Sequence, residues 1–138
     1  MTLDSVKYNL VDSADDRTSK VEFWDNGIVF IKLRDNVTIE IEDAQNQYHF
    51  LKSKYNHINK HLVLVETGND TSISKEAREF SAKPESNEMT KAMAVIVKSL
   101  AHRLIINFII KFTHHQSMKM KMFDDKHKAI DWLLSFKK

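Results

Sequence analysis

Two short runs beyond residue 60 are apolar at every one of four or more positions, and they constrain the fold more than any other feature. They lie at residues 62–65 (Leu-Val-Leu-Val) and 92–97 (Ala-Met-Ala-Val-Ile-Val). A strand that is apolar on both faces is typical of the centre of a sheet that helices cover on each side. We therefore expect these runs to be two central strands of an α/β domain.

The part of the chain before these runs predicts further strands. Apolar and polar residues alternate at residues 21–24 and 37–41, with a return strand at 28–33. Asn26-Gly27 favours a two-residue hairpin turn between the first two strands, because both residues tolerate positive φ. We therefore expect an antiparallel meander of three strands.

Residues 1–20 are expected to form an N-terminal extension or an extra edge strand ahead of a domain that spans residues 21–138. Val6, Tyr8 and Leu10 alternate with polar neighbours, which favours a short strand. The stretch 12–19 is polar and acidic, and we expect it to be a loop.

Amphipathic helices are predicted between the later strands. Apolar residues recur every three or four positions from Ala44 to Ile58, and Glu42 and Asp43 suit the first turn of this helix. Three more helices are predicted at residues 74–82, 99–113 and 125–136, with a strand at 118–122 where Met alternates with Lys. A meander followed by alternating helices and strands predicts a mixed sheet packed by helices.

The composition excludes several classes of protein. The 138-residue chain has no cysteine, which excludes a disulfide framework, a thiolate zinc site and a cysteine nucleophile, and which fits a cytoplasmic protein. A net charge of +2 does not indicate a nucleic-acid binder. No apolar stretch approaches the roughly 20 residues that span a bilayer, so we expect no transmembrane segment.

We find no motif for catalysis or metal binding. The seven histidines lack the spacing of a metal site, so we expect neither a metal nor a cofactor. Glu66 ends a buried strand and is the best-placed carboxylate, but acid–base catalysis needs a partner group in a cleft. We therefore expect no enzymatic activity.

Several segments together carry a resemblance to a known family. They are residues 23–28 (Phe-Trp-Asp-Asn-Gly-Ile), residues 72–80 (Ser-Ile-Ser-Lys-Glu-Ala-Arg-Glu-Phe), Ala101-His102-Arg103-Leu104 with Asn107-Phe108, and Phe123-Asp124-Asp125 leading into residues 129–133. Over residues 21–136 the chain resembles small uncharacterised bacterial proteins of STAS-like type, related to the SpoIIAA-like fold of anti-sigma-factor antagonists. The resemblance implies a STAS-like (SpoIIAA-like) mixed α/β sheet, a cytosolic bacterial protein and no established enzymatic activity.

The resemblance also implies a candidate switch loop. In anti-sigma-factor antagonists, a kinase phosphorylates a Ser or Thr at the start of the helix after the central strand. The matching residues here are Ser72 and Ser74, and Lys75 and Arg78 are close enough in sequence to meet a phosphate at this helix terminus. The Asp-Ser-Ser-Gly-like pattern of the antagonists is absent. The alternative is that Ser74 is simply the N-cap of the helix.

The helix at residues 99–113, capped by Ser99, is apolar nearly all round. One face has Leu104, Ile105, Phe108, Ile109 and Phe112, a second has Leu100, Ile106 and Ile110, and the polar stripe is Arg103, Asn107 and Lys111. Such a helix is buried on more than one side. One face can cover the sheet, and the other needs a partner. The candidate partner or ligand residues are Arg103, Ile106, Asn107 and Ile110.

Two functions follow as expectations. The first is a non-enzymatic regulatory or protein-interaction module that forms a homodimer through the helix at 99–113, with a further protein partner as a possibility. The alternative is a binder of a small apolar or lipid-like ligand between this helix and the sheet; the SpoIIAA-like fold shares features with lipid-binding CRAL-TRIO domains, an analogy of fold only. Burial of the second face within the chain remains open.

Overall fold

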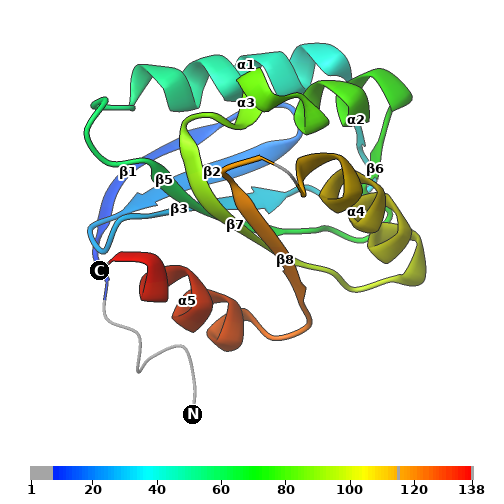
Figure 1. The fold of residues 1–138 in the computed structure, drawn as a ribbon. Coiled ribbons are helices and arrows are strands. Elements are labelled where there is room, and N and C mark those ends of the chain that lie inside the picture. The colour runs from blue at the N-terminus through cyan, green and yellow to red at the C-terminus, as the bar shows by residue number, and fades with distance from the viewer. Residues whose placement is uncertain (1–7, 115, 138) are drawn as a thin grey trace.

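A six-stranded mixed sheet in the order β1-β2-β3-β5-β7-β8 forms the centre of the molecule (Figure 1). The computed structural model describes residues 8–114 and 116–137. The strands are β1 (Leu10–Asp15), β2 (Ser19–Trp24), β3 (Ile28–Leu33), β4 (Thr38–Ile39), β5 (His61–Glu66), β6 (Ser72–Ile73), β7 (Thr90–Ile96) and β8 (Lys119–Phe123). The helices are α1 (Ile41–Ser53), α2 (Lys75–Ala82), α3 (Pro84–Asn87), α4 (Leu100–Thr113), α5 (Lys126–Leu134) and a terminal 3₁₀ turn, η2 (Ser135–Lys137).

The sheet changes from antiparallel to parallel at β3. The first three strands pair antiparallel, whereas β3, β5, β7 and β8 pair parallel. The helices that connect the parallel strands lie on one face of the sheet, and α5 lies on the other (Figure 1). The carboxyl ends of the four parallel strands therefore share one edge, and their amino ends share the opposite edge.

The two apolar runs are central strands, as predicted. Leu62 and Leu64 of β5 point into the core under α5, and Val63 points into the core under α1. Ala92 and Ala94 of β7 are buried in the α5 core beside Ala129, which lets the helix lie close to the sheet. Burial of both faces explains why these runs contain no polar residue.

The meander differs from the prediction in its third strand. Only Thr38–Ile39 forms a strand (β4) in the region 37–41, and it pairs with β6 outside the main sheet. The third antiparallel strand is instead β1, an edge strand within the N-terminal 20 residues. The predicted loop at residues 12–19 is wrong for residues 12–15 and 19, which are in strands, whereas residues 16–18 do form a loop. Residues 1–7 lie outside the described part of the chain. The side chains of β1 are mostly exposed, and the strand is held by backbone pairing to β2.

The hairpin between β2 and β3 has three connecting residues, not the predicted two. Residues 25–27 lie between the paired strands, and only Gly27 has positive φ, at 94°. The Gly27 N–H donates to the carbonyl of Trp24 at 3.1 Å. A Gly with positive φ at the end of a three-residue loop is a common hairpin solution.

The predicted N-cap residues locate the starts of three helices correctly, whereas the apolar stripe overestimates the length of the first helix. Ser74, Ser99 and Asp125 each accept a backbone N–H at the start of α2, α4 and α5. The first helix ends at Ser53, however, so the predicted stripe to Ile58 is too long, and the Ile58 side chain is 80% exposed. The strand at 119–123 has exposed lysines that alternate with half-buried methionines, as predicted.

Candidate functional site

The loop after β5 lies at the carboxyl edge of the parallel strands and is held by side-chain hydrogen bonds. The Thr67 hydroxyl donates to the carbonyl of Ile96 at 3.0 Å. The Thr71 hydroxyl accepts from the N–H of Gly68 at 3.0 Å and donates to the carbonyl of Arg34 at 2.8 Å. Residues 67–74 are therefore a fixed loop that joins β5, β7 and the turn after β3.

The four predicted switch residues surround the start of α2 but do different things. The Ser74 Oγ accepts the N–H of Ala77 at 3.1 Å, so it is an N-cap. Ser72 is exposed in β6, and its Oγ lies 2.8 Å from the hydroxyl of Thr38. Lys75 is exposed, whereas the guanidinium of Arg78 lies 5.4 Å from the centre of the Phe108 ring on α4. Arg78 thus points to α4.

The loop and α4 also meet through a buried histidine. The Nε2 of His102 lies 2.7 Å from the carbonyl oxygen of Thr71, and His102 is 8% exposed. A carbonyl can only accept, so Nε2 donates in this contact. His102 and Arg78 therefore connect the two regions that the sequence marked separately as a switch loop and a partner helix.

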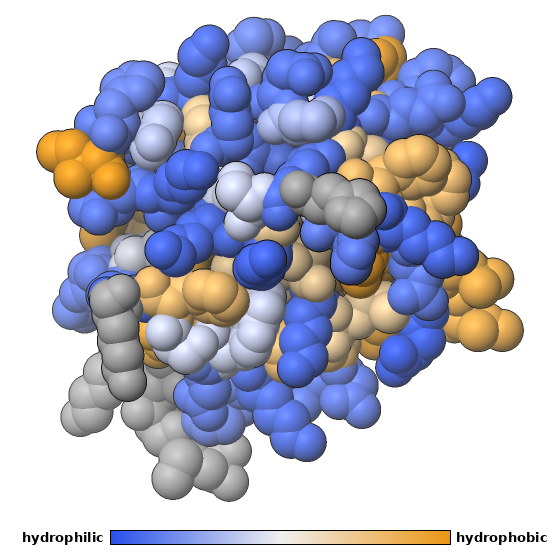
Figure 2. All heavy atoms as spheres, viewed as in Figure 1, coloured by the Kyte–Doolittle hydropathy of each residue, from blue (hydrophilic) through white to orange (hydrophobic). Residues whose placement is uncertain are grey.

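Helix α4 faces differently from the prediction. Its buried residues are His102, Ile109 and Thr113. Its exposed side carries four large apolar side chains at four-residue intervals, and we call this set the α4 apolar row: Leu100, Leu104, Phe108 and Phe112. The expectation that Leu104, Phe108 and Phe112 share a face with buried Ile109 was wrong, because these three side chains face solvent. Figure 2 shows apolar residues gathered over α4 at the right of the view.

The predicted partner residues of α4 lie on both sides of the helix. Arg103 and Asn107 are exposed beside the α4 apolar row. Ile106 is half-buried and faces the sheet, where it lines two small cavities. Ile110 is half-buried and lines neither cavity. The four residues therefore do not form one surface.

A cavity lies between α4, α1 and the sheet. Its volume is about 170 Å³, and a smaller space of about 60 Å³ adjoins it under the first half of α4. Apolar side chains make up most of the lining of the larger one, among them Tyr48, Leu51, Met93, Val95, Ile106 and Ile109. A few polar residues, including Gln47 and Asn87, complete it. This is the position in which the alternative function places an apolar ligand.

A groove lies on the outer side of α4, next to the C-terminal half of the α4 apolar row. It has a volume of about 530 Å³ and separates α4 from the segment that contains α2 and α3. Its lining consists of Glu79, Ala82, Lys83, Pro84, Phe108, Phe112 and Gln116. The outer surface of α4 is therefore a ridge at its N-terminal half and a groove at its C-terminal half.

Glu66, at the carboxyl end of β5, is surrounded by lysines. The ammonium groups of Lys98, Lys126 and Lys32 lie 3.2, 3.5 and 3.7 Å from its carboxylate oxygens. Burial acts to raise the pKa of Glu66, but the hydrogen bond from Lys98 and the charges of Lys126 and Lys32 outweigh it and hold the pKa below its usual value. The three lysines make Glu66 the centre of an ion-pair cluster that joins β3, β5, α5 and the residues after β7.

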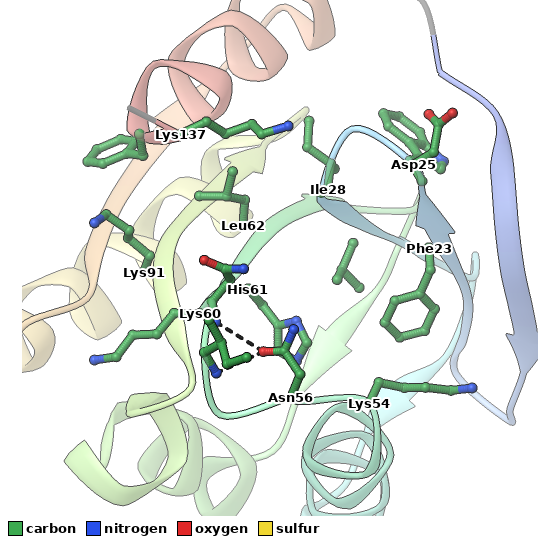
Figure 3. Close-up of a pocket in the computed structure, with 16 residues that line it drawn as sticks. Phe23, Asp25, Ile28, Lys54, Asn56, Lys60, His61, Leu62, Lys91 and Lys137 are labelled. Carbon is green, nitrogen blue, oxygen red and sulfur yellow. Dashed lines mark hydrogen bonds between the residues drawn. The ribbon is translucent and has the colours of Figure 1, made fainter.

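The largest pocket among those described lies at the opposite edge of the sheet and was not found from the sequence (Figure 3). It has a volume of about 620 Å³ and lies between the segment 54–61, the β2–β3 hairpin and η2. Four lysines line it: Lys54, Lys60, Lys91 and Lys137. They come from three segments: Lys54 and Lys60 from residues 54–61, Lys91 from β7 and Lys137 from η2. No local run of basic residues therefore marked the site.

Neither a metal site nor a membrane-spanning helix is found in the described part of the chain. No group of three or more His, Asp or Glu residues is placed to hold a metal ion among residues 8–114 and 116–137. Within the same residues, every helix is too short or too polar to cross a bilayer.

Comparison with known proteins assigns the chain to a family. The model of the family described as "Domain of unknown function (DUF7793)" matches residues 23–137. The chain belongs to this family. A search of curated proteins gave no match.

The fold also has a counterpart among solved structures. An uncharacterized protein from the DUF3478 family with a SpoIIAA-like fold, from Shewanella loihica PV-4, aligns with a TM-score of 0.58 at 17% sequence identity. The match covers 92% of this chain and 95% of that chain. The predicted STAS-like (SpoIIAA-like) α/β fold is therefore confirmed. At this identity, the likeness concerns the fold alone.

Proposed function

We propose that the chain is a non-enzymatic, cytoplasmic interaction module of regulatory type, and that it forms a homodimer through the exposed face of α4. The observation that carries the proposal is the α4 apolar row. Leu104 is 63% exposed and Leu100 is 73% exposed, and they lie on the same helix face as two exposed phenylalanines. Contiguous apolar patches on a soluble protein mark interaction surfaces more often than single exposed residues do.

The shape of this face supports a second copy of the chain as the occupant. The leucines form a ridge at the N-terminal half of α4, and the groove beside Phe108 and Phe112 lies at its C-terminal half. If two copies pack α4 against α4 in antiparallel orientation, the leucine ridge of each copy enters the groove of the other. Such a surface is self-complementary about a two-fold axis, which is what an isologous dimer requires.

The surroundings of the row match the usual anatomy of an interface. Its centre is apolar and aromatic, while Arg103, Asn107 and Lys111 lie along one border and Glu79 lies along the other. Interfaces commonly have an apolar core with aromatic residues and a polar rim. His102 connects the buried side of α4 to the loop 67–74, and Arg78 of α2 lies over Phe108 of the row.

A charge placed in the centre of the row tests the proposal. We expect Leu104→Glu to convert the dimer to a monomer in sedimentation velocity, because each copy would bury an unpaired carboxylate. The Leu104 side chain is exposed in a single chain, so the substitution leaves the core intact. Val11→Glu, at a side chain 66% exposed on β1, is the matched control and should stay dimeric. A Leu104→Glu variant that still sediments as a dimer would contradict the proposal.

The alternative function has an observation of its own. The cavity of about 170 Å³ beneath α4 is lined mainly by apolar side chains with a few polar groups, which is the usual character of a small-ligand site. It is smaller than most ligand pockets, which measure roughly 300–1,000 Å³. Native mass spectrometry separates the two functions: a co-purified apolar ligand that is lost from an Ile106→Trp variant supports the alternative, and a bare chain opposes it.

A further inference from the structure

The lysine-lined pocket at the amino edge of the parallel strands is independent of α4 and of the switch loop. It lies across the starts of β3 and β5 and the end of β2 (Figure 3). Its volume of about 620 Å³ is within the range of small-ligand sites, roughly 300–1,000 Å³. We call it the amino-edge pocket.

Apolar side chains form part of the floor and walls of the amino-edge pocket. Ile28 and Leu62, both buried, lie at the base, and the half-buried rings of Phe23 and Phe136 line its sides. The side chain of Ile58 belongs to the lining and is largely exposed to solvent. A ligand in this pocket would therefore cover apolar and aromatic surface.

The rim of the amino-edge pocket is strongly basic. Lys54, Lys60, Lys91 and Lys137 line it, against one carboxylate, Asp25. Asp25 is already engaged, because its two oxygens accept the backbone N–H and the side-chain amide of Asn9 at 2.8 and 3.0 Å. The lining therefore has an excess of positive charge.

Two of the four ammonium groups are available to a ligand. Lys54 is paired with Asp12 at 2.6 Å, and Lys137 donates to the carbonyl of Asn26 at 2.7 Å. The ammonium groups of Lys60 and Lys91 have no hydrogen-bond or ion-pair partner among the described residues. In Figure 3 the ammonium groups of these two lysines lie on the same side of the pocket, and that of Lys54 lies on the other side.

The segment that carries Lys60 is held in shape by its own hydrogen bonds. The Asn56 Oδ1 accepts the N–H groups of Ile58 and Asn59 at 2.8 and 3.0 Å. The Nε2 of His61 donates to the carbonyl of Leu51 at 3.0 Å, which fixes the end of this segment against α1. The backbone of this part of the rim is therefore positioned without a ligand.

We propose that the amino-edge pocket binds an organic phosphate, with the phosphate at Lys60 and Lys91 and an apolar or aromatic portion against Leu62 and Phe136. A lysine ammonium binds a phosphate as a point charge, and an apolar floor adds affinity for the rest of the ligand. The same chemistry is offered by a soluble phosphate ester and by an anionic phospholipid headgroup.

Titration with phenyl phosphate, followed by backbone NMR, tests the site. We expect saturable shifts at Gly27, residues 56–62 and Lys91, with weaker binding of inorganic phosphate and of uncharged benzyl alcohol. Because each free ammonium makes a charge-assisted contact, we expect Lys60→Gln and Lys91→Gln each to weaken binding about fivefold, and the double variant to weaken it at least about tenfold. The exposed residues Lys119 and Lys121 of β8 give the matched control, K119Q/K121Q, which should bind as the wild type does.

The source of the phosphate is tested with vesicles. Co-sedimentation of the wild-type chain, but not of the K60Q/K91Q variant, with vesicles of phosphatidylcholine and phosphatidylserine assigns the site to a lipid headgroup. Binding of phenyl phosphate without co-sedimentation assigns it to a soluble ester.

The proposal is overturned if phenyl phosphate leaves the pocket residues unshifted and the vesicles do not bind. It is also overturned if K60Q/K91Q binds phenyl phosphate as tightly as the wild type. Leu104→Glu should not alter the binding of phenyl phosphate. The experiments can therefore refute the homodimer proposal and the phosphate-site proposal separately.

Discussion

Replacement of Gly68 by alanine tests how tightly the loop after β5 is packed. A Cβ at this position would lie 2.7 Å from the carbonyl oxygen of Arg34 and 2.7 Å from the Oγ1 of Thr71. Contacts of this length do not occur in real structures, and one of the two atoms belongs to backbone that cannot rotate away. The loop and the turn after β3 must therefore separate.

The cost of this separation has two parts. Forcing an extra methyl into packed structure costs about 1–3 kcal/mol. The shift also strains the two hydrogen bonds of the Thr71 hydroxyl, each with a net contribution of about 1 kcal/mol. We expect Gly68→Ala to lower the free energy of unfolding by about 2–4 kcal/mol. For a chain of this size, that is a fall in Tm of roughly 6–15 °C.

Gly27→Ala is the matched control, measured by the same thermal and urea unfolding. Its nearest neighbours are the flexible end of the Lys137 side chain, at 3.8 and 3.9 Å, so no clash arises. Only the positive φ of 94° opposes alanine, at a cost of about 1–2 kcal/mol. Both substitutions change the unfolded chain equally. If Gly68→Ala is no more destabilising than Gly27→Ala, the described packing of the loop is wrong.

Two further predictions concern single side chains near the carboxyl ends of the parallel strands. Ser74→Ala should lower the free energy of unfolding by about 1 kcal/mol through loss of the α2 cap, whereas Ser74→Asp should keep it; equal stability of all three chains would remove the cap interpretation. Glu66→Gln should destabilise the fold at neutral pH by about 1 kcal/mol. Because the pKa of Glu66 is lowered by folding, this contribution is present above about pH 4.5 and is lost as the pH falls below it. Urea unfolding at several pH values should therefore show the wild type and Glu66→Gln converging in acid, and a constant difference would contradict the ion-pair account.

The parts of the fold that could be predicted from the sequence are those with local signals. The strands β5 and β7 have no polar residue inside their apolar runs, and Ser74, Ser99 and Asp125 stand where helices begin. These signals do not depend on distant parts of the chain. The SpoIIAA-like arrangement followed from the order of such elements together with a family resemblance.

Strand pairing was harder to predict because it is not local. The segment 37–41 alternates as a strand does, but its partner β6 lies more than thirty residues later and draws it out of the main sheet. Strand β1 has little apolar character, because its side chains are mostly exposed. Backbone pairing to β2 holds it, together with the ion pairs of Asp12 with Lys54 and of Asp15 with Arg34. The residue pattern of neither segment predicts its pairing partner.

For the candidate sites too, local features could be predicted from the sequence and non-local contacts could not. The sequence marked α4 as a helix with too many apolar residues, but a helix that is apolar nearly all round does not reveal which face meets the sheet. In the structure, buried His102 bonds to the Thr71 carbonyl, and the α4 apolar row lies on the exposed side of the helix. The amino-edge pocket was missed because its lysines come together only in the folded chain.

The mass of the wild-type chain in solution tests the central claim, that α4 is a homodimer interface, most directly. Light scattering coupled to size exclusion should give twice the chain mass of 16.1 kDa. Because the proposed interface is apolar at its centre, we expect the dimer to persist at about 0.5 M salt, where interactions between exposed charges are largely screened. A mass of 16.1 kDa at every concentration and salt condition would contradict the claim and leave the α4 apolar row without a second copy to cover it.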